Sequence, residues 1–282
     1  MGNIIWLASY PKSGNTWMRA LLHNLFTNAR EPLPLNEIGG GGISTGATNL
    51  NWFQALDPRP PAQWSAADID RMRAPAQKVI ADAHQGSVFV KIHAPVMHVA
   101  GHPTVNLSVS TGAIYILRNP LDVAVSFADY AGLTLDRAIA MMATHDLVVP
   151  RKGAYVNEVY GSWSQNVLSW TASPGPGLHV VRYEDLAENP LEALRKVTAF
   201  LRLDASPERL ERAVRHASFE ELQRQEESAG FIERSPAQER FFRSGKVGGW
   251  RDVLSPEQVR QIVAAHGQQM ARFGYIPEGY ET

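Results

Sequence analysis

Cysteine is missing from all 282 positions of the sequence. Its absence excludes a disulfide scaffold, a cysteine-ligated zinc site, an iron–sulfur cluster and a cysteine nucleophile. An excess of positive charge is also lacking, since 27 Lys and Arg residues face 28 Asp and Glu residues. General binding to nucleic acid is therefore disfavoured, because no basic surplus is available to release counterions from a phosphate backbone.

Long apolar runs are absent as well. No stretch reaches the ~20 residues that a membrane-spanning helix needs, and the apolar run Ile4–Ala8 is too short for a secretory signal. The hydrophobic fraction of 44% and the charged fraction of 20% are those of an ordinary soluble globular protein. We therefore expect a cytoplasmic protein that has neither a membrane nor a nucleic acid as its partner.

Short apolar segments alternate with amphipathic ones along the chain. Buried parallel strands are predicted at Asn3–Ser9, Ser87–Ile92, Ala113–Leu117 and Gly177–Arg182. Helical spacing of apolar residues predicts helices at Asn15–Phe26, Ala66–Ala83, Pro120–Tyr130, Asn157–Thr171, Pro190–Leu201, Pro207–His216, Phe219–Glu227 and Pro256–Phe273. This alternation predicts an α/β fold in which a central parallel β-sheet is flanked by helices on both faces. No linker interrupts the pattern, so we expect a single domain over residues 1–282.

The strongest local signal is the turn Tyr10–Trp17, between the first predicted strand and the first predicted helix. A glycine-containing turn at that place presents free backbone N–H groups, and the helix dipole adds positive potential. Lys12 adds a full charge, and Ser13, Asn15 and Thr16 add hydrogen-bond donors. The pattern favours a phosphate cradle over an ordinary strand–helix turn with a solvated lysine. It is not the nucleoside-triphosphate loop, because the lysine here comes before the glycine.

Two further predicted strands end on residues suited to phosphate or proton handling. Arg118 ends the third strand, at the edge where open α/β sheets bind ligands, and Ser126 lies about two helical turns further on. An arginine and a hydroxyl suit a phosphate, the alternative being a structural pair between Arg118 and Asp122. Lys91 and His93 end the second strand on the same side, which makes His93 either a general base or a surface residue. These groups at three strand ends converge on one crevice.

Taken in order along the chain, the motifs resemble those of the PAPS-dependent sulfotransferases of the cytosolic and bacterial type, where PAPS is 3′-phosphoadenosine 5′-phosphosulfate. They are the turn Tyr10–Trp17, the triplet Lys91–His93, the run Arg118–Ser126, the tetrapeptide Arg182–Asp185, and Phe242–Gly245 followed by Gly248–Trp250. The resemblance spans residues 4 to about 252. It implies a P-loop-NTPase-like sulfotransferase fold and an enzyme that moves a sulfuryl group from PAPS to a hydroxyl of a small-molecule acceptor by in-line displacement.

The resemblance also implies which residues hold PAPS. The donor is expected to be bound by Pro11, Lys12, Ser13, Gly14, Asn15, Thr16, Trp17, Arg118, Ser126, Tyr183, Phe219, Arg243, Ser244 and Gly245. Within this set, Arg118 and Ser126 are expected to hold the 3′-phosphate, and Arg243 and Gly245 to close over it. Ser244 stands where the cytosolic animal enzymes usually carry lysine. The sequence therefore does not predict how residues 243–245 close over the 3′-phosphate.

Four residues are expected to serve the reaction itself. His93 is expected to take the proton of the acceptor hydroxyl, and Lys91 resembles its companion lysine. Lys12 is expected to neutralise the charge that grows on the departing 5′-phosphate, and Ser126 completes the set. Because a sulfonate carries less charge than a phosphoryl group, no metal is expected. We interpret Glu184–Asp185 as a helix N-cap rather than as a magnesium site.

The acceptor is left open by the sequence, since a phenol, an aliphatic alcohol, a sugar or a natural product would all fit. Loops set specificity on such a scaffold, and those expected to line the acceptor site are residues 30–61, 94–111 and 132–156. Trp52 and Phe53 follow four glycines at 39–42, and they either wall this pocket or pack in the core. Trp163 and Trp170 lie seven residues apart on one predicted helix face and are expected in the core.

Two other functions would also use a parallel sheet and a phosphate loop. An ATP-dependent small-molecule kinase is one, but the position of the lysine and the missing magnesium carboxylates count against it. A non-catalytic nucleotide-binding module is the other, and the intact Lys12, His93 and Ser126 count against it. The C-terminal dimer motif of the animal enzymes is absent, so the sequence predicts no oligomeric state.

Overall fold

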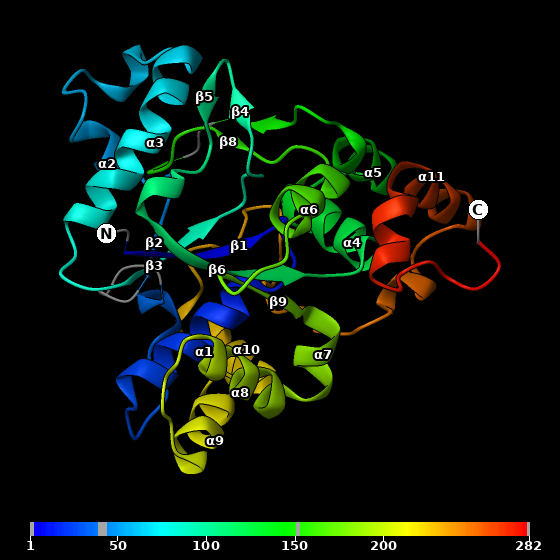
Figure 1. The fold of residues 1–282 in the computed structure, drawn as a ribbon. Helices are drawn as coiled ribbons and strands as arrows, with labels where there is room; N and C mark the ends of the chain where they lie inside the picture. The colour runs from blue at the N-terminus through cyan, green and yellow to red at the C-terminus, as the bar shows by residue number, and fades with distance from the viewer. Residues whose placement is uncertain (1–2, 39–43, 151–152, 281–282) are drawn as a thin grey trace.

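The computed structural model of the protein describes residues 3–38, 44–150 and 153–280 (Figure 1). Its central sheet is fully parallel, with the strand order β2 (Ser44–Gly46), β3 (Val88–Ile92), β1 (Ile4–Ser9), β6 (Ser110–Leu117) and β9 (Leu178–Arg182). The four predicted strands are therefore confirmed, and β2 is an addition at one edge. The glycines at 39–42 lie outside the described residues.

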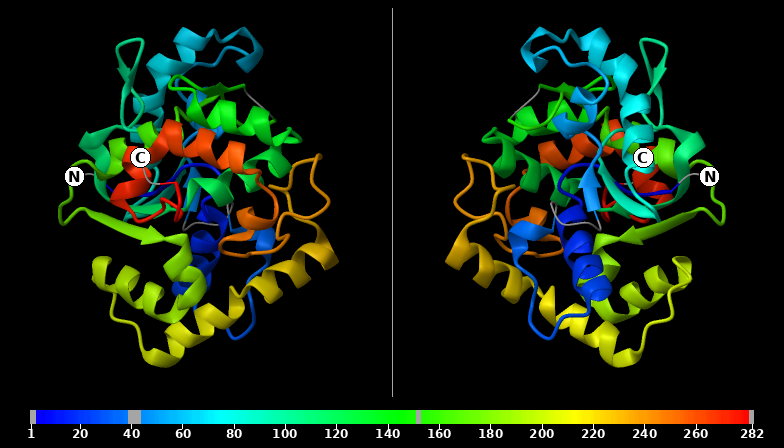
Figure 2. Two further views of the ribbon diagram at one scale, coloured as in Figure 1. Left: turned by 90° about the vertical axis from the view of Figure 1, so that its right-hand side faces the viewer. Right: turned by 90° about the vertical axis from the view of Figure 1, so that its left-hand side faces the viewer.

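Helices cover both faces of this sheet, as the α/β prediction requires. They are α1 (Asn15–Thr27), α2 (Leu50–Gln54), α3 (Ala66–Asp82), α4 (Pro120–Ala131), α5 (Leu135–Ala143), α6 (Trp163–Thr171), α7 (Tyr183–Glu188), α8 (Pro190–Phe200), α9 (Pro207–His216), α10 (Phe219–Ala229) and α11 (Pro256–Arg272). Two short hairpins pair β4 (His98–Val99) with β5 (His102–Pro103) and β7 (Val148–Val149) with β8 (Glu158–Val159). Figure 2 shows the yellow helices α8–α10 on one side of the sheet and the green and red helices α4–α6 and α11 on the other.

Alternation along the strands divides the apolar side chains between two cores. Trp6 of β1 and Tyr115 of β6 face the core that α4, α5, α6 and α11 complete. Leu7 and Ile114, their neighbours in the chain, face the core that α1, α8 and α9 complete. Because successive side chains of a strand point to opposite faces, strands covered on both sides must be apolar throughout. This is why the apolar runs of β1 and of the second half of β6 could be recognised as buried strands.

The helix predicted over residues 157–171 is shorter in the structure. It begins only at residue 163, and residues 158–159 pair in a hairpin instead. Gly161 has a φ of 60°, which interrupts a helix, and Ser162 then caps the new one through a capping box with Gln165. The apolar spacing that suggested one long helix therefore spans two elements.

The large aromatic side chains belong to the cores. Trp163 is fully buried and Trp170 nearly so, which confirms the prediction for both. Phe53 is fully buried against Trp64, with ring centroids 6.5 Å apart, because α2 packs on α3. Among the described residues, neither Trp52 nor Phe53 lines the cavity described below, so the interpretation of this pair as a pocket wall is wrong.

The strand order determines where a ligand can bind. The chain passes from β1 to the edge strand β2, returns to β3 beside β1, and then crosses to β6 on the other side of β1. Since all these strands are parallel, their carboxyl ends lie at one edge, and the connections that follow β1 and β3 run in opposite directions across the sheet. Open α/β sheets bind ligands in the crevice at such a reversal.

Candidate active site

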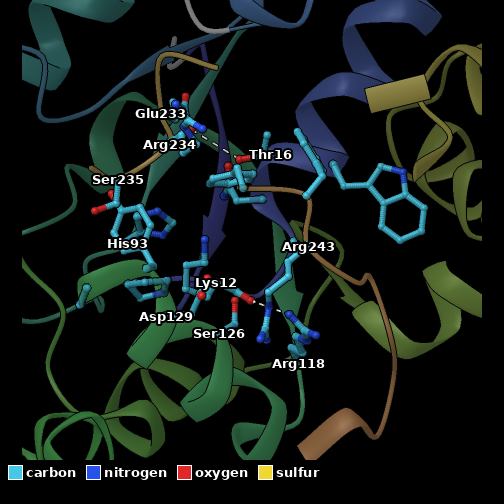
Figure 3. Close-up of a pocket in the computed structure, with 18 of the residues that line it drawn as sticks. Lys12, Thr16, His93, Arg118, Ser126, Asp129, Glu233, Arg234, Ser235 and Arg243 are labelled. Carbon is cyan, nitrogen blue, oxygen red and sulfur yellow. Dashed lines mark hydrogen bonds between the residues drawn. The ribbon is translucent and has the colours of Figure 1, made fainter. Parts of the chain in front are cut away.

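A cavity of about 880 Å³ opens at the carboxyl edge of the sheet (Figure 3). Its wall contains Lys12, Lys91, His93, Arg118 and Ser126, the residues that the sequence placed at three strand ends. The other predicted donor residues on the wall are Pro11, Gly14, Asn15, Thr16, Trp17, Tyr183, Phe219, Arg243, Ser244 and Gly245. The predicted convergence of distant motifs on one crevice is thus what the structure shows.

The turn before α1 has the form that an anion site needs. Gly14 has a φ of 103°, and a Cβ there would come within 2.7 Å of the Tyr183 ring, so only glycine fits. Within the described chain, α1 has no side-chain N-cap, which leaves its first N–H groups for an anion. Ser13 is absent from the wall that the described residues define, and its buried Oγ has no hydrogen-bond partner among them. Asn15 instead braces the turn against β1, since its amide donates to the carbonyl of Leu7 at 2.9 Å.

Lys12 is held in an unusual environment for a lysine. Its Nζ lies 4.4 Å from the ring centre of Tyr130 and 4.0 Å from that of Phe241. Burial lowers the pKa of Lys12 to about 7, with Asp129 opposing this change and Arg118 adding to it. No ion pair joins Lys12 to a carboxylate of the described residues, and an incoming anion would stabilise its charged form.

Arg118 reaches the same cavity from the end of β6. Its guanidinium carbon lies 4.1 Å from the ring centre of Tyr183, and Nη1 donates to the carbonyl of Lys12 at 3.1 Å. Its Nε is buried without a hydrogen-bond partner among the described residues. Asp122 accepts two backbone N–H groups of residues 248–250, at 2.8 and 3.0 Å. The alternative of a structural Arg118–Asp122 pair is therefore wrong.

Aromatic side chains gather beside the arginine. The Tyr183 hydroxyl donates to the carbonyl of Gly245 at 3.1 Å, and its ring centre lies 5.7 Å from that of Trp17. Trp17 is fixed in turn, because its Nε1 donates to the carbonyl of Ala217 at 2.8 Å. Gly245 has a φ of 61°, and a Cβ there would come within 2.8 Å of the Phe219 ring. This part of the wall offers flat apolar surfaces of the kind on which a planar base stacks.

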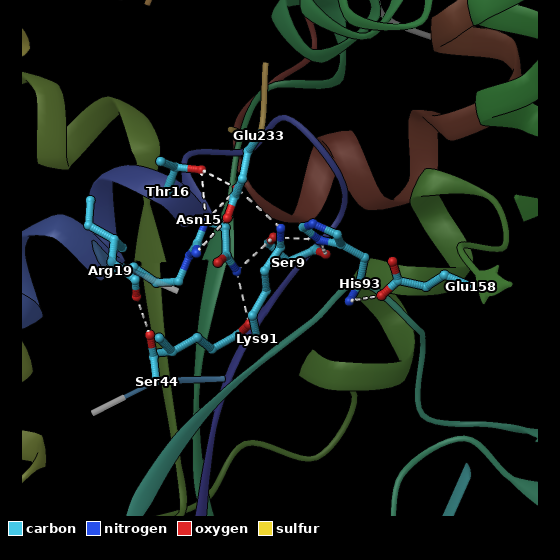
Figure 4. Close-up of polar contacts among 11 residues, drawn as sticks. Ser9, Asn15, Thr16, Arg19, Ser44, Lys91, His93, Glu158 and Glu233 are labelled. Atoms are coloured by element: carbon cyan, nitrogen blue, oxygen red, sulfur yellow. Dashed lines mark hydrogen bonds and ion pairs between the residues drawn. The ribbon is translucent and has the colours of Figure 1, made fainter. Parts of the chain in front are cut away.

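His93 lies directly after β3 and is nearly buried (Figure 4). Its Nδ1 lies 2.9 Å from the carbonyl oxygen of Ser9 and 3.2 Å from the Ser9 hydroxyl. A carbonyl can only accept, so Nδ1 carries the proton and Nε2 keeps a free lone pair. Burial lowers the pKa of His93 to about 3, and the charge of Lys91 adds to this effect, so the ring is neutral. Glu158 accepts the backbone N–H of His93 at 3.0 Å and fixes this end of the strand.

Comparison with known proteins assigns the chain to a family. Residues 3–274 match the family described as the sulfotransferase domain. The chain is a member of the sulfotransferase family. Sulfotransferase 1A1 of the dog, Canis lupus familiaris, is 26% identical over 286 residues, which cover 95% of this chain and 83% of the relative. The predicted enzyme class is confirmed.

Solved structures agree with this assignment at the level of the fold. A mouse sulfotransferase complexed with PAP has a TM-score of 0.61 at 23% identity, over 95% of this chain and 84% of that one. A retinol dehydratase in complex with retinol and PAP has a TM-score of 0.62 at 21% identity, over 96% of this chain and 82% of that one. The predicted sulfotransferase fold is therefore confirmed.

The sulfotransferase site also contains a charge cluster that the sequence did not predict. Arg19 of α1 is only 2% exposed, and its two terminal nitrogens donate to the carboxylate of Glu233 at 2.8 and 2.7 Å. Lys91 Nζ lies 3.4 Å from the same carboxylate, and Thr16 Oγ1 lies 3.5 Å from it. Glu233 belongs to residues 230–252, here called the lid segment, which forms one side of the cavity. Arg19 and Glu233 are 214 residues apart, so no local spacing links them.

Two of the three predicted loops line the other side of the sulfotransferase cavity. Loop 30–61 and loop 132–156 contribute Thr45, Gly46, Thr48, Asn49, Val149, Pro150, Gly153, Tyr155 and Val156. Residues 151–152 lie outside the described chain. Loop 94–111 contributes nothing to the wall as the described residues define it, so that prediction is wrong. The reason is that its hairpin packs on α3, where Gln77 donates to a carbonyl of this loop at 2.7 Å.

The acidic pair after β9 has a structural task in the sulfotransferase. Glu184 accepts the backbone N–H of Asn119 at 2.9 Å and the hydroxyl of Tyr275 at 2.6 Å. It lies in the first turn of α7 rather than at the N-cap, which is Arg182, so the predicted cap is wrong. The described residues contain no group of three His, Asp or Glu side chains placed to hold a metal ion. Over the same ranges, no helix is long and apolar enough to cross a membrane.

Proposed function

We propose that this sulfotransferase moves the sulfuryl group of PAPS to a hydroxyl of a small-molecule acceptor. The bond from sulfur to the bridging oxygen breaks while a bond from sulfur to the acceptor oxygen forms. The acceptor proton passes to Nε2 of His93, and the bridging electron pair stays on the 5′-phosphate of the product PAP. One observation carries the proposal: Lys12, Lys91 and His93 share a single cavity wall with Arg118 and Ser126.

Features of the described residues fit the two ends of the donor. Arg118, which lines the cavity, has a buried Nε without a partner among those residues, and a phosphate in the cavity would satisfy it. We assign the turn from Pro11 to Thr16 to the 5′-phosphosulfate, because the uncapped start of α1 favours negative charge there. Arg118 and Ser126 are assigned to the 3′-phosphate, and Arg243, Ser244 and Gly245, which line the same cavity, are assigned to its enclosure.

The adenine and the leaving group complete the donor assignment. Trp17, Tyr183 and Phe219 supply the aromatic surfaces for the base. When bound, PAPS supplies a sulfuryl group already joined to a phosphate leaving group. The protein has to hold this group in line and neutralise the charge that develops on the bridging oxygen. Lys12 has that role in the proposal, since its buried ammonium has no close anionic partner among the described residues.

His93 is proposed as the general base because its tautomer is already set. The Ser9 carbonyl holds the proton on Nδ1, so Nε2 is the atom left to accept a proton. Burial is the largest cause of the lowered pKa of His93, and the positive charges of Lys91 and Arg19 lower it further. The negative charges of a bound donor oppose those two cations, so His93 becomes a stronger base when PAPS is in place.

The wall of the cavity supports a small-molecule acceptor. The volume of about 880 Å³ lies within the range of ~300–1,000 Å³ typical of small-molecule sites. Tyr155 and Ile232 expose apolar surface along it, while Thr45, Asn49 and Glu158 supply polar groups. The related retinol dehydratase structure holds retinol, a small alcohol, in its complex. We further propose a single domain over residues 1–282 and a cytoplasmic location.

The direct test is transfer of label. The protein is incubated with PAPS carrying radioactive sulfur and a panel of phenols, alcohols and sugars, without magnesium, and labelled sulfate esters are separated. His93→Ala is expected to lose turnover by about 10²–10⁴-fold while it still binds PAP. Turnover retained in a purified His93→Ala variant would reject His93 as the base.

A thermal shift measurement addresses the kinase alternative, which the family assignment already disfavours. PAP is expected to raise the melting temperature without magnesium, because a ligand that binds only the folded state stabilises it. ATP with magnesium is expected to leave the melting temperature unchanged. The opposite pair of results would contradict the proposed donor.

A further inference from the structure

The lid segment places a negative charge among the cations of the donor site. The carboxylate of Glu233 contacts Arg19 through two hydrogen bonds, of 2.8 and 2.7 Å, and Lys91 Nζ lies 3.4 Å away. Burial favours the neutral acid, but Lys91 and Arg19 together hold the pKa of Glu233 well below its ordinary range. The carboxylate is therefore ionised at any pH at which the enzyme would work.

This charge cannot easily move out of the way. The Arg19 side chain is 2% exposed and that of Glu233 is 18% exposed, so the pair is largely buried. Separating the two partners would leave an uncompensated guanidinium inside the protein, which is strongly unfavourable. A bidentate pair between an arginine and a carboxylate also fixes the orientation of both groups. Glu233 is therefore expected to stay in place when the donor enters.

The carboxylate lies next to Thr16, which the proposed function assigns to the 5′-phosphosulfate, and next to Lys91, which lines the same cavity as the proposed base His93. Lys91 Nζ is 3.4 Å and Thr16 Oγ1 is 3.5 Å from the same oxygen, Oε2 of Glu233. Figure 4 shows Glu233 between Arg19 and Thr16 on one side and Lys91 on the other. A sulfonate held by Lys91 and Thr16 would therefore lie within a few ångströms of a fixed like charge. At the effective dielectric constant of a protein site, such charges repel appreciably.

We propose that Glu233 sets the discrimination between donor and product by repelling the sulfonate of PAPS, a charge that PAP does not carry at that place. The inference rests on the proposed function, because it needs PAPS as the donor. During transfer, negative charge leaves the sulfonate and collects on the bridging oxygen beside Lys12, as in loose phosphoryl transfer. The repulsion is therefore largest in the bound donor and smaller in the transition state. An interaction that destabilises only the ground state raises kcat.

The decisive measurement is the ratio of two dissociation constants, that of PAPS to that of PAP, determined by titration calorimetry without acceptor. In Glu233→Gln this ratio is expected to fall about tenfold, because the amide keeps a hydrogen-bond acceptor for Arg19 but not the charge. In steady-state assays the KM for PAPS and kcat are expected to fall together. Glu227→Gln is the matched control, since Glu227 pairs with the exposed Arg240 of the lid segment and does not line the cavity that the described residues form.

The outcomes separate this role from a structural one. If both affinities change by the same factor, Glu233 only fastens the lid segment, and the proposal is overturned. A rise in the ratio also overturns it. Should Glu233→Gln fail to fold, the double variant Arg19→Met/Glu233→Met removes the whole buried pair, and its ratio is expected to fall about threefold. A wild-type protein that binds neither PAPS nor PAP would refute the proposed function itself, whereas wild-type turnover with an unchanged ratio in Glu233→Gln refutes only the role of Glu233.

Discussion

The buried lysine of the first turn makes nucleotide binding depend on pH in a calculable way. Burial lowers the pKa of Lys12 to about 7, so above this pH the free protein increasingly carries a neutral amine. A bound 5′-phosphate favours the ammonium and returns the pKa toward its ordinary value near 10.5. Binding must then take up a proton between these two values, and affinity must fall as pH rises through the lower one.

The size of the effect follows from the lowered pKa. With a free-state pKa of about 7, roughly nine-tenths of the free protein has lost the Lys12 proton at pH 8, and nearly all of it at pH 9. The dissociation constant of PAP is therefore expected to rise about ninefold from pH 8 to pH 9. At pH 8 each binding event is expected to take up about 0.9 proton.

Titration calorimetry in two buffers with different ionisation enthalpies measures both quantities, the affinity and the proton uptake. Lys12→Arg is the matched variant, because a guanidinium stays protonated and cannot contribute a slope in this range. An affinity of the wild-type protein that does not change between pH 8 and pH 9 would show that Lys12 does not titrate as described. A slope of equal size in Lys12→Arg would assign the proton to another group.

Three substitutions test other parts of the site. Gly14→Ala puts a Cβ 2.7 Å from the Tyr183 ring at a φ of 103°, so the free energy of unfolding should fall by more than about 1 kcal/mol, as measured by urea denaturation. Asp122→Ala removes the carboxylate that accepts two backbone hydrogen bonds from residues 248–250, each worth about 1.5–3 kcal/mol. The lid segment is then held less firmly, so stopped-flow kinetics should show faster dissociation of PAP. Arg118→Met should raise the dissociation constant of PAP about tenfold or more in titration calorimetry, while that of AMP, which lacks the 3′-phosphate, should stay nearly unchanged. Equal losses of affinity for both nucleotides would contradict the assignment of Arg118 to the 3′-phosphate.

The parts of the site that the sequence predicted share one physical property, which is that their signal is local. The strands β1, β3 and β6 are largely apolar because both their faces are buried, and each is followed within three residues by a polar residue that lines the cavity. Lys12, His93 and Arg118 all come one to three residues after a strand ends. Parallel strands bring such residues to one edge without further information. The sequence therefore sufficed to predict that these residues line one cavity.

The parts that it missed depend on contacts between distant segments. Arg19 and Glu233 form an ion pair although 214 residues separate them in the sequence. The sequence around either residue contains no signal that the other lies beside it. The three residues of β2, Ser44–Gly46, pair with β3, but a segment this short with only one strand-favouring residue, Thr45, does not predict a strand. Loop 94–111 was expected beside the acceptor, but its hydrogen bond to Gln77 holds it against α3.

The order in which the chain leaves the ribosome separates folding of the scaffold from binding of the nucleotide. Every strand of the central sheet ends by Arg182, whereas Arg243, Ser244 and Gly245 on the cavity wall are translated some sixty residues later. A nascent polypeptide can thus complete its parallel sheet before it can enclose a ligand. During translation, PAPS can stabilise only a molecule that has been synthesised past Gly245, because ligands stabilise the states that bind them.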